Sequence, residues 1–221
     1  MSQKYQLLTN DTKTISHPKT GLPVKLYRIY SLEKIKVSNT MTIPSGQLGG
    51  YIQSEKNLPN TLEDGSWVLH NAMVFDNAVL KNNSVIMQNS AVYGNAIIDK
   101  SMVKEFVRIF DNTIITDSII TGNSDISGQA KLTNVLCNNA TKVSKNAIVK
   151  NSKLFGGAYV TDESVLDGCE LYDFARVYGK STLTNCILKS AALVRDQNHT
   201  NATLSRDIEL NQSYPEIQGR F

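Results

Sequence analysis

The chain has 221 residues, a formal net charge of +3 and a hydrophobic content of 41%, values that suit one sizeable folded domain. No apolar run approaches the roughly 20 residues that a membrane-spanning helix needs, and the N-terminus lacks the apolar core of a secretory signal. Lysine and arginine are spread along the chain without forming a basic stripe. These features predict a protein that binds neither membranes nor nucleic acids.

Residues 1 to about 60 do not share the repeat that follows them. Apolar and polar residues alternate over 24–30 as they do in a strand, and 46–52 has the pattern of a turn that enters a second strand. Gly49-Gly50 favours a tight turn over a phosphate-binding loop, because no Lys-Ser/Thr follows at the required spacing. We expect a small β-rich cap that covers the first coil of the repeat and blocks edge-to-edge pairing.

From residue 61 to 196 a short motif recurs, in which an aliphatic residue lies two positions after a small one. The small residues follow one another at steps of six, six and five, so equivalent positions recur every 17 residues. The columns of small residues run from Ser84, Ser90 and Ala96, and the aliphatic columns run from Ile86, Val92 and Ile98. Such a period is typical of a solenoid.

The columns predict how each coil is built. Because side chains alternate along a strand, three short strands per coil direct both kinds of column inward, and each buried large aliphatic residue contributes about 1.5–3 kcal/mol. The residue two positions after each aliphatic one is often Gly, Asn or Asp, which tolerate the positive φ of a corner, and all five prolines lie outside the repeat. The sequence therefore predicts an all-β chain that forms a single-stranded parallel β-helix of about seven coils of 17–18 residues.

The columns end near Asp196, after which the chain becomes polar. We expect residues 197–221 to form a second cap. The predicted organisation is thus an N-terminal cap over 1–60, a β-helix over 61–196 and a C-terminal cap segment over 197–221.

The residue between the small and the aliphatic position points outward, and these residues define three faces. The first face carries Trp67, Val85, Met102, Ile119, Leu136, Lys153 and Glu170, the second carries Met73, Ala91, Arg108, Asp125, Lys142, Tyr159 and Arg176, and the third carries Val79, Ile97, Ile114, Lys131, Ile148 and Val165. The first and third faces are largely apolar and the second is mostly polar. Two adjacent apolar stripes predict a contact surface, and we expect a three-fold self-association in which each rod presents both, although a terminal segment folded over one stripe is an alternative. The candidate self-association residues are Val85, Met102, Ile119 and Leu136 with Ile97, Ile114 and Ile148.

The three cysteines, Cys137, Cys169 and Cys186, have no spacing typical of a zinc site or a disulfide framework. We expect free thiols in a cytoplasmic protein, and no metal site. Cys169 and Cys186 occupy one column a coil apart, so their Cα atoms should be about 5 Å apart. We interpret both as small core residues.

Leu-Gly-Gly-Tyr-Ile at 48–52, Glu-Lys-Asn-Leu at 55–58 and the start of the repeat at Trp67-Val68 and Asn71-Ala72 resemble the YdcK-like hexapeptide-repeat proteins. The resemblance spans nearly the whole chain. It implies the left-handed β-helix of the trimeric LpxA-like superfamily, whose members are often described as transferases by analogy of fold.

The resemblance also directs attention to histidine, because hexapeptide acyltransferases use a histidine as general base near a coenzyme A groove between subunits. We expect His17 in a surface loop, His70 at a corner of the first coil and His199 exposed at the end of the rod. His70 is the leading catalytic candidate. However, no carboxylate lies in a column position that would orient it, and residues 84–185 contain no inserted loop that would hold a substrate.

Our leading interpretation is a non-catalytic β-helical scaffold or self-association module of unknown ligand, cytoplasmic, homotrimeric and without a cofactor. Its apolar outer faces also suit a protein partner. The alternative is a coenzyme A-dependent acyltransferase that uses a coenzyme A thioester at a site between protomers. A third interpretation, a sugar-binding or phage-tail-type rod, depends on shape alone.

Overall fold

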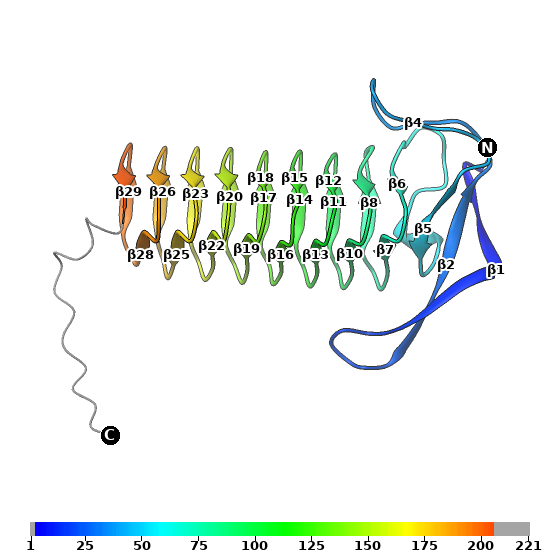
Figure 1. Cartoon of the computed structure of the whole chain (residues 1–221), viewed down its shortest axis with the longest axis horizontal. Coiled ribbons are helices and arrows are strands. Elements are labelled where there is room, and N and C mark those ends of the chain that lie inside the picture. Colours follow the sequence, from blue (N-terminus) through cyan, green and yellow to red (C-terminus); the bar gives the residue numbers. More distant parts are fainter. Residues whose placement is uncertain (1–2, 206–221) are drawn as a thin grey trace.

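A computed structural model describes residues 3–205, and over this range the chain is built almost entirely of strands. Short strands stack along one axis into a rod, and a long hairpin lies at its N-terminal end (Figure 1). Within residues 3–205 the one helical element is the short 3-10 turn η1 (Glu55–Asn57). The prediction of an all-β parallel β-helix with a β-rich N-terminal cap is confirmed.

Three long sheets form the three faces of the rod. The first face consists of β6 (Trp67–Val68), β9 (Val85–Ile86), β12 (Met102–Val103), β15 (Ile119–Ile120), β18 (Leu136–Cys137), β21 (Lys153–Leu154), β24 (Glu170–Leu171), β27 (Ile187–Leu188) and β30 (Thr203–Leu204). The second face consists of β7 (Met73–Val74), β10 (Ala91–Val92), β13 (Arg108–Ile109), β16 (Asp125–Ile126), β19 (Lys142–Val143), β22 (Tyr159–Val160), β25 (Arg176–Tyr178) and β28 (Leu193–Arg195). The third face consists of β8 (Val79–Lys81), β11 (Ile97–Asp99), β14 (Ile114–Thr116), β17 (Lys131–Thr133), β20 (Ile148–Lys150), β23 (Val165–Asp167), β26 (Thr182–Thr184) and β29 (Asn198–Thr200).

Neighbouring coils pair in parallel with the register that the columns predicted. Ile98 lies beside Ile115 on the third face, and Val103 lies beside Ile120 on the first. All four of these side chains are fully buried, as are the small residues between them and the corners. The rod has about eight turns of about 17 residues, and not seven, because β29 and β30 continue the stacking to Leu204.

The corners have the backbone conformation that their residue types predicted. Asp76 has a φ of 56°, Gly122 of 81° and Asn139 of 70°, and the other Gly and Asp corner residues also have positive φ. The corner between the third and first faces follows the same rule, at Asp117 and Asn134. Asparagine, aspartate and glycine adopt the left-handed region at low cost, so the chain can turn a corner every five or six residues with little backbone strain.

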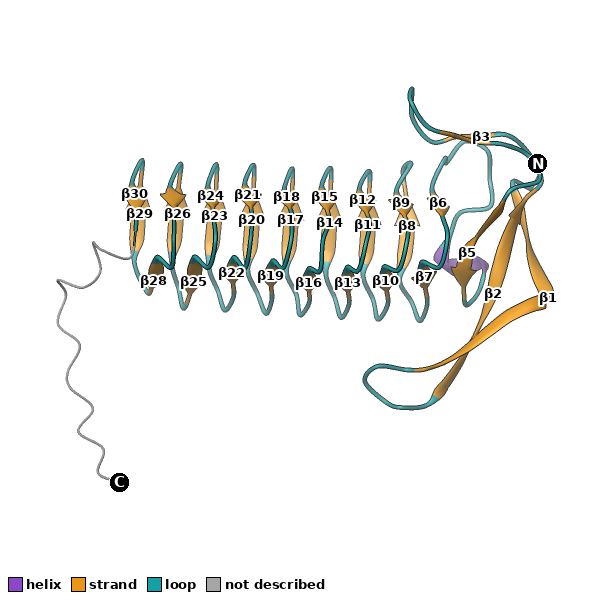
Figure 2. Cartoon of the chain, in the orientation of Figure 1, coloured by secondary structure: helices purple, strands orange, loops and turns teal. Residues whose placement is uncertain are grey.

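The N-terminal cap extends the sheet of the second face (Figure 2). β1 (Tyr5–Ser16) and β2 (Pro23–Ser31) form an antiparallel hairpin, and β2 pairs antiparallel with β5 (Leu48–Ile52). β5 in turn pairs parallel with β7, so it is the strand at which the cap joins the rod. The strands expected over 24–30 and within 46–52 are therefore present, whereas sequence reasoning missed β1.

The hairpin bends back over one corner of the rod, and this placement corrects the expectation for His17. Its imidazole is only 11% exposed and packs edge-on against Phe75 and Tyr93, two stacked rings at the corner between the second and third faces. The Nε2 atom lies 3.0 Å from Asp76 Oδ2, and Nδ1 accepts the backbone N–H of Lys19 at 3.1 Å. His17 thus fastens the cap to the rod instead of lying free in a surface loop.

A second, smaller hairpin covers the beginning of the first face. It is formed by β3 (Ile35–Lys36) and β4 (Thr42–Ile43), and its Val37 joins the core cluster that contains Trp67 and Val85. Trp67 is fully buried and Val85 is 2% exposed. The prediction that Val85 belongs to an exposed contact surface is therefore wrong, because a segment of its own chain covers it.

The cap also buries a lysine that the sequence reasoning did not single out. The side chain of Lys4 is fully buried, and Nζ donates to the carbonyl oxygens of Asp64 at 2.6 Å and Ser66 at 3.1 Å. Loss of hydration lowers the pKa of Lys4 to about 8, although the nearby Asp64 carboxylate partly opposes the shift.

The lowered pKa of Lys4 predicts a pH dependence of stability. Between pH 8 and about 10.4, the ordinary value in an unfolded chain, the unfolded state binds more protons at this site than the folded state does, so stability rises with pH. We expect the free energy of unfolding of the wild type, relative to that of Lys4→Met, to increase from pH 7 to pH 9.5 in chemical denaturation. Groups common to both proteins cancel in this difference. A difference that stays constant would contradict the lowered pKa.

At the C-terminal end, β29 places His199 in register with Leu183, in a column that faces inward. His199 lies in the last described coil, as expected, but it is half-buried and not exposed, and its Nε2 lies 3.1 Å from Gln197 Oε1. Residues 197–205 continue the rod past the residue at which the sequence columns end. The remainder of the expected C-terminal cap, 206–221, lies outside the described residues.

Candidate functional site

The first face offers a groove where the small hairpin ends. The groove has a volume of about 340 Å³, and its apolar lining includes Val37 and Met41 of the hairpin with Met102 and Ile119 of the rod. Polar side chains at the neighbouring corner, among them Asp117, complete the wall. The hairpin therefore covers the first two outward positions of the stripe and leaves the next ones open.

Beyond the groove the apolar stripe continues for two coils and then ends. Ile119 is 45% exposed and Leu136 is half-buried. In the next two coils the same positions carry Lys153 and Glu170, whose Nζ and Oε1 atoms form an ion pair at 2.9 Å. The uncovered part of this stripe is thus Met102, Ile119 and Leu136.

The third face presents a second apolar stripe. Ile114 is 37% exposed, and Ile97, Ile148 and Val165 are half-buried. Lys131 interrupts the stripe between Ile114 and Ile148. The six predicted self-association residues other than Val85 therefore lie on two faces that meet at one corner.

Side-chain amides stabilise that shared corner along the rod. Asn134 Nδ2 donates to Asn151 Oδ1 at 2.9 Å, and Asn151 Nδ2 donates to Asp167 Oδ1 at 2.8 Å. Nearer the cap, Asn82 Nδ2 donates to Asp99 Oδ1 at 2.8 Å. These bonds link successive coils along the rod axis at the corner where the two stripes meet.

His70, the candidate catalytic residue, is exposed at the corner between the first and second faces with a φ of 59°. Its Nδ1 accepts the backbone N–H of Gln88 at 3.3 Å, a bond that supports the corner of the next coil. Within residues 3–205 no carboxylate is paired with its imidazole. The geometry of His70 is that of a turn residue with a free Nε2, and it lacks the orienting partner that a general base commonly has.

The three histidines do not come together into one site. His17 lies under the cap hairpin, His70 lies at an exposed corner, and His199 lies in the last coil. Among the residues described, no group of three or more His, Cys, Asp or Glu side chains is arranged to hold a metal ion.

The cysteines are free and buried, as predicted. Burial raises the pKa of Cys169 to about 11, and it also raises the pKa of Cys137. Cys169 Sγ contacts the carbonyl oxygen of Leu183 at 3.4 Å. All three cysteines serve as small core residues.

These features define the chain as a parallel β-solenoid with coils of about 17 residues, an architecture consistent with the hexapeptide-repeat β-helix. No family model matches the chain, and no curated protein matches its sequence. In the part of the chain that the structure describes, no helix is both long and apolar enough to span a membrane.

Proposed function

We propose that the protein is a non-catalytic β-helical scaffold that associates with copies of itself through the stripes on its first and third faces. The observation that carries the proposal is that the cap covers Trp67 and Val85 but leaves Met102, Ile119 and Ile114 open to solvent. Exposed apolar side chains in a continuous stripe are typical of contact surfaces.

A three-fold assembly suits the position of the two stripes. They lie on adjacent faces of the rod, so in a closed ring the first face of each copy can contact the third face of the next, and we propose that the ring contains three copies. We also propose that the chain is one of the YdcK-like hexapeptide-repeat proteins and that it is cytoplasmic. The resemblance at residues 48–72 supports the family, and the free, buried cysteines support the compartment.

Charged residues in the stripes test self-association. We expect the wild type to have a native mass near three times the 24.4 kDa of one chain, measured by light scattering coupled to size exclusion. Ile119→Asp and Ile114→Asp should each yield single chains, because a carboxylate buried at the contact without a partner costs several kcal/mol. Circular dichroism would verify that both variants keep their fold.

Lys142→Asp is the matched control, since Lys142 occupies the same outward position on the second face and is exposed. This variant should keep the native mass of the wild type. A wild type that elutes as a single chain, or an Ile119→Asp variant with unchanged mass, would contradict the proposal.

The acyltransferase alternative would use the same assembly, with coenzyme A between protomers and His70 as base. The absence of a carboxylate partner for His70 within the described range favours the scaffold. Thermal stabilisation by coenzyme A that is lost in His70→Ala would favour the enzyme instead.

A further inference from the structure

A short column of stacked rings ends near the C-terminal end of the first face. The rings of Phe155 and Tyr172 lie one coil apart, with their centroids 5.3 Å apart and their planes 22° from parallel. The equivalent position in the following coil is occupied by Lys189, so the stack stops at Tyr172.

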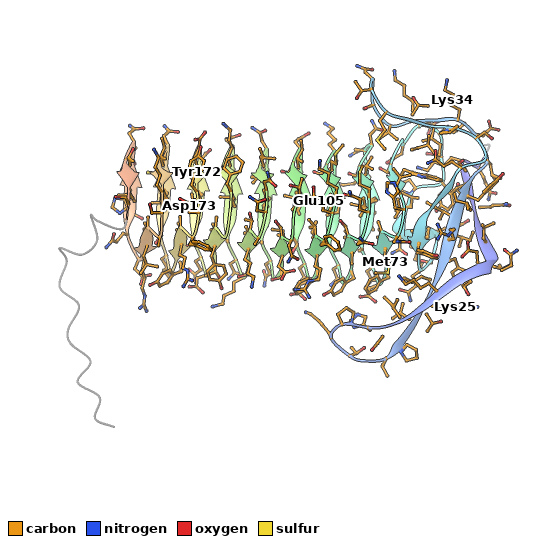
Figure 3. The ribbon with its side chains drawn as sticks, viewed as in Figure 1. Lys25, Lys34, Met73, Glu105, Tyr172 and Asp173 are labelled. Atoms are coloured by element: carbon orange, nitrogen blue, oxygen red, sulfur yellow. The ribbon has the colours of Figure 1, made fainter. Side chains whose placement is uncertain are left out.

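An open recess of about 430 Å³ begins where the stack stops. It is lined by Glu170, Tyr172, Asp173, Ile187, Lys189 and Ser190. Tyr172 and Asp173 lie on the part of the rod far from the N-terminal hairpin (Figure 3). Phe155 covers the ring face of Tyr172 that looks toward the N-terminal coils, and Ile187, Lys189 and Ser190 belong to the next coil. The second face of the Tyr172 ring therefore borders the recess.

The ring of Tyr172 is held in place from its hydroxyl end. The Tyr172 hydroxyl donates to Glu170 Oε2 at 2.6 Å, and Lys153 Nζ donates to Glu170 Oε1 at 2.9 Å. These two bonds lower the pKa of Glu170, so its carboxylate is charged at neutral pH. Because both oxygens of Glu170 are engaged, this residue orients the ring and leaves ligand contacts to its neighbours.

Polar groups with free bonding capacity lie on the other sides of the recess. Asp173 Oδ2 accepts the backbone N–H of Ser190 at 3.0 Å, which leaves Oδ1 as an acceptor toward the recess. Lys189 and the Ser190 hydroxyl add donors, and both residues are exposed. The recess is lined by the carboxylates of Glu170 and Asp173 and by the ammonium group of Lys189, and Lys153, outside the lining, forms an ion pair with Glu170 that offsets one of the negative charges.

We propose that this recess binds a neutral saccharide, with a pyranose ring stacked on the free face of Tyr172 and its hydroxyl groups bonded to Asp173, Lys189 and Ser190. A pyranose has one apolar face of C–H groups and a rim of hydroxyls, each a donor and an acceptor, and the recess pairs an aromatic face with a carboxylate, an ammonium and a hydroxyl.

The charge and the shape of the recess favour this ligand over two others. Two carboxylates would repel an anion such as a phosphate ester. Lys153 is already paired with Glu170, so only the ammonium group of Lys189 could bind the anion. A flat apolar ligand would leave Asp173 and Lys189 without partners on desolvation. The recess lies beyond the apolar stripe of the first face, so the proposal does not depend on the contacts of that stripe.

Saturation-transfer NMR on the full-length protein tests the proposal. The probes are millimolar glucose, galactose, mannose and N-acetylglucosamine with their linear tetrasaccharides, and sialic acid and inorganic phosphate are the charged comparisons. We expect at least one neutral saccharide to bind. Tyr172→Ala should weaken that binding by about tenfold or more, because the stacked ring face is lost.

Three further variants make the result specific. Tyr172→Phe keeps the ring and should keep most of the affinity, whereas Asp173→Asn should weaken binding severalfold without straining a corner that asparagine tolerates. Phe106→Ala is the control, since Phe106 is a 62% exposed ring at the corresponding corner of an earlier coil and should be without effect. Binding of none of the neutral saccharides, binding of the charged probes alone, or neutral binding that survives Tyr172→Ala would overturn the proposal.

Discussion

Alanine in place of Gly122 is expected to lower the free energy of unfolding by about 2–5 kcal/mol. Gly122 has a φ of 81°, and a Cβ added there would lie 2.4 Å from the carbonyl oxygen of Asn139 and 2.5 Å from its Cα. The substitution therefore combines a left-handed conformation that alanine disfavours with a collision against the backbone of the next coil. Chemical denaturation followed by circular dichroism measures the loss.

Gly21 is the matched control for this effect. Its φ of 71° is similar, but nothing lies within 4 Å of an added Cβ in the hairpin turn. Gly21→Ala should therefore cost only the conformational part, about 1 kcal/mol. Equal losses in the two variants would mean that the contact between coils contributes nothing.

Ile115→Ala is expected to destabilise the rod by about 2–5 kcal/mol, whereas Ile114→Ala should change stability by less than about 1 kcal/mol. The two residues are neighbours in β14 and have the same side chain, but Ile115 is fully buried and Ile114 is 37% exposed. Truncation of Ile115 leaves a cavity beside Ile98 and Leu132, its partners in the adjacent coils.

Denaturation should be compared on single chains, because Ile114 also lies in the proposed self-association stripe. Ile119→Asp provides a suitable background in which the assembly is absent. A small effect of Ile115→Ala in that background would contradict the inward register of the column.

The two proposed surfaces of the first face are physically separate. The stripe of Met102, Ile119 and Leu136 ends where Lys153 and Glu170 form their ion pair, and the saccharide recess begins at Glu170. A charged residue at Ile119 should therefore abolish assembly without changing saccharide binding, and Tyr172→Ala should have the opposite effect. This combination of results would show that self-association and saccharide binding use different residues of the first face.

Much of the fold could be predicted from the sequence, because each copy of the repeat specifies the same local structure. The period of 17 gave the inward columns, the strand register and the positive φ of residues such as Asp76 and Gly122. These features depend on side-chain alternation and corner propensity within a coil and its neighbour, so no long-range information was needed. The buried, free state of the three cysteines followed for the same reason.

The tertiary structure alone decided what the non-repeating segments cover. The sequence gives no sign that the hairpin of β3 and β4 buries Val85, that His17 reaches Asp76, or that Lys4 is fully buried. Each of these contacts joins residues far apart in the chain. A polar or charged side chain is buried only where it finds a hydrogen-bond partner, and that partner is known only from the tertiary structure. Likewise, the Tyr172 ring became a candidate site only when the stack on Phe155 and the recess on its other side were in view.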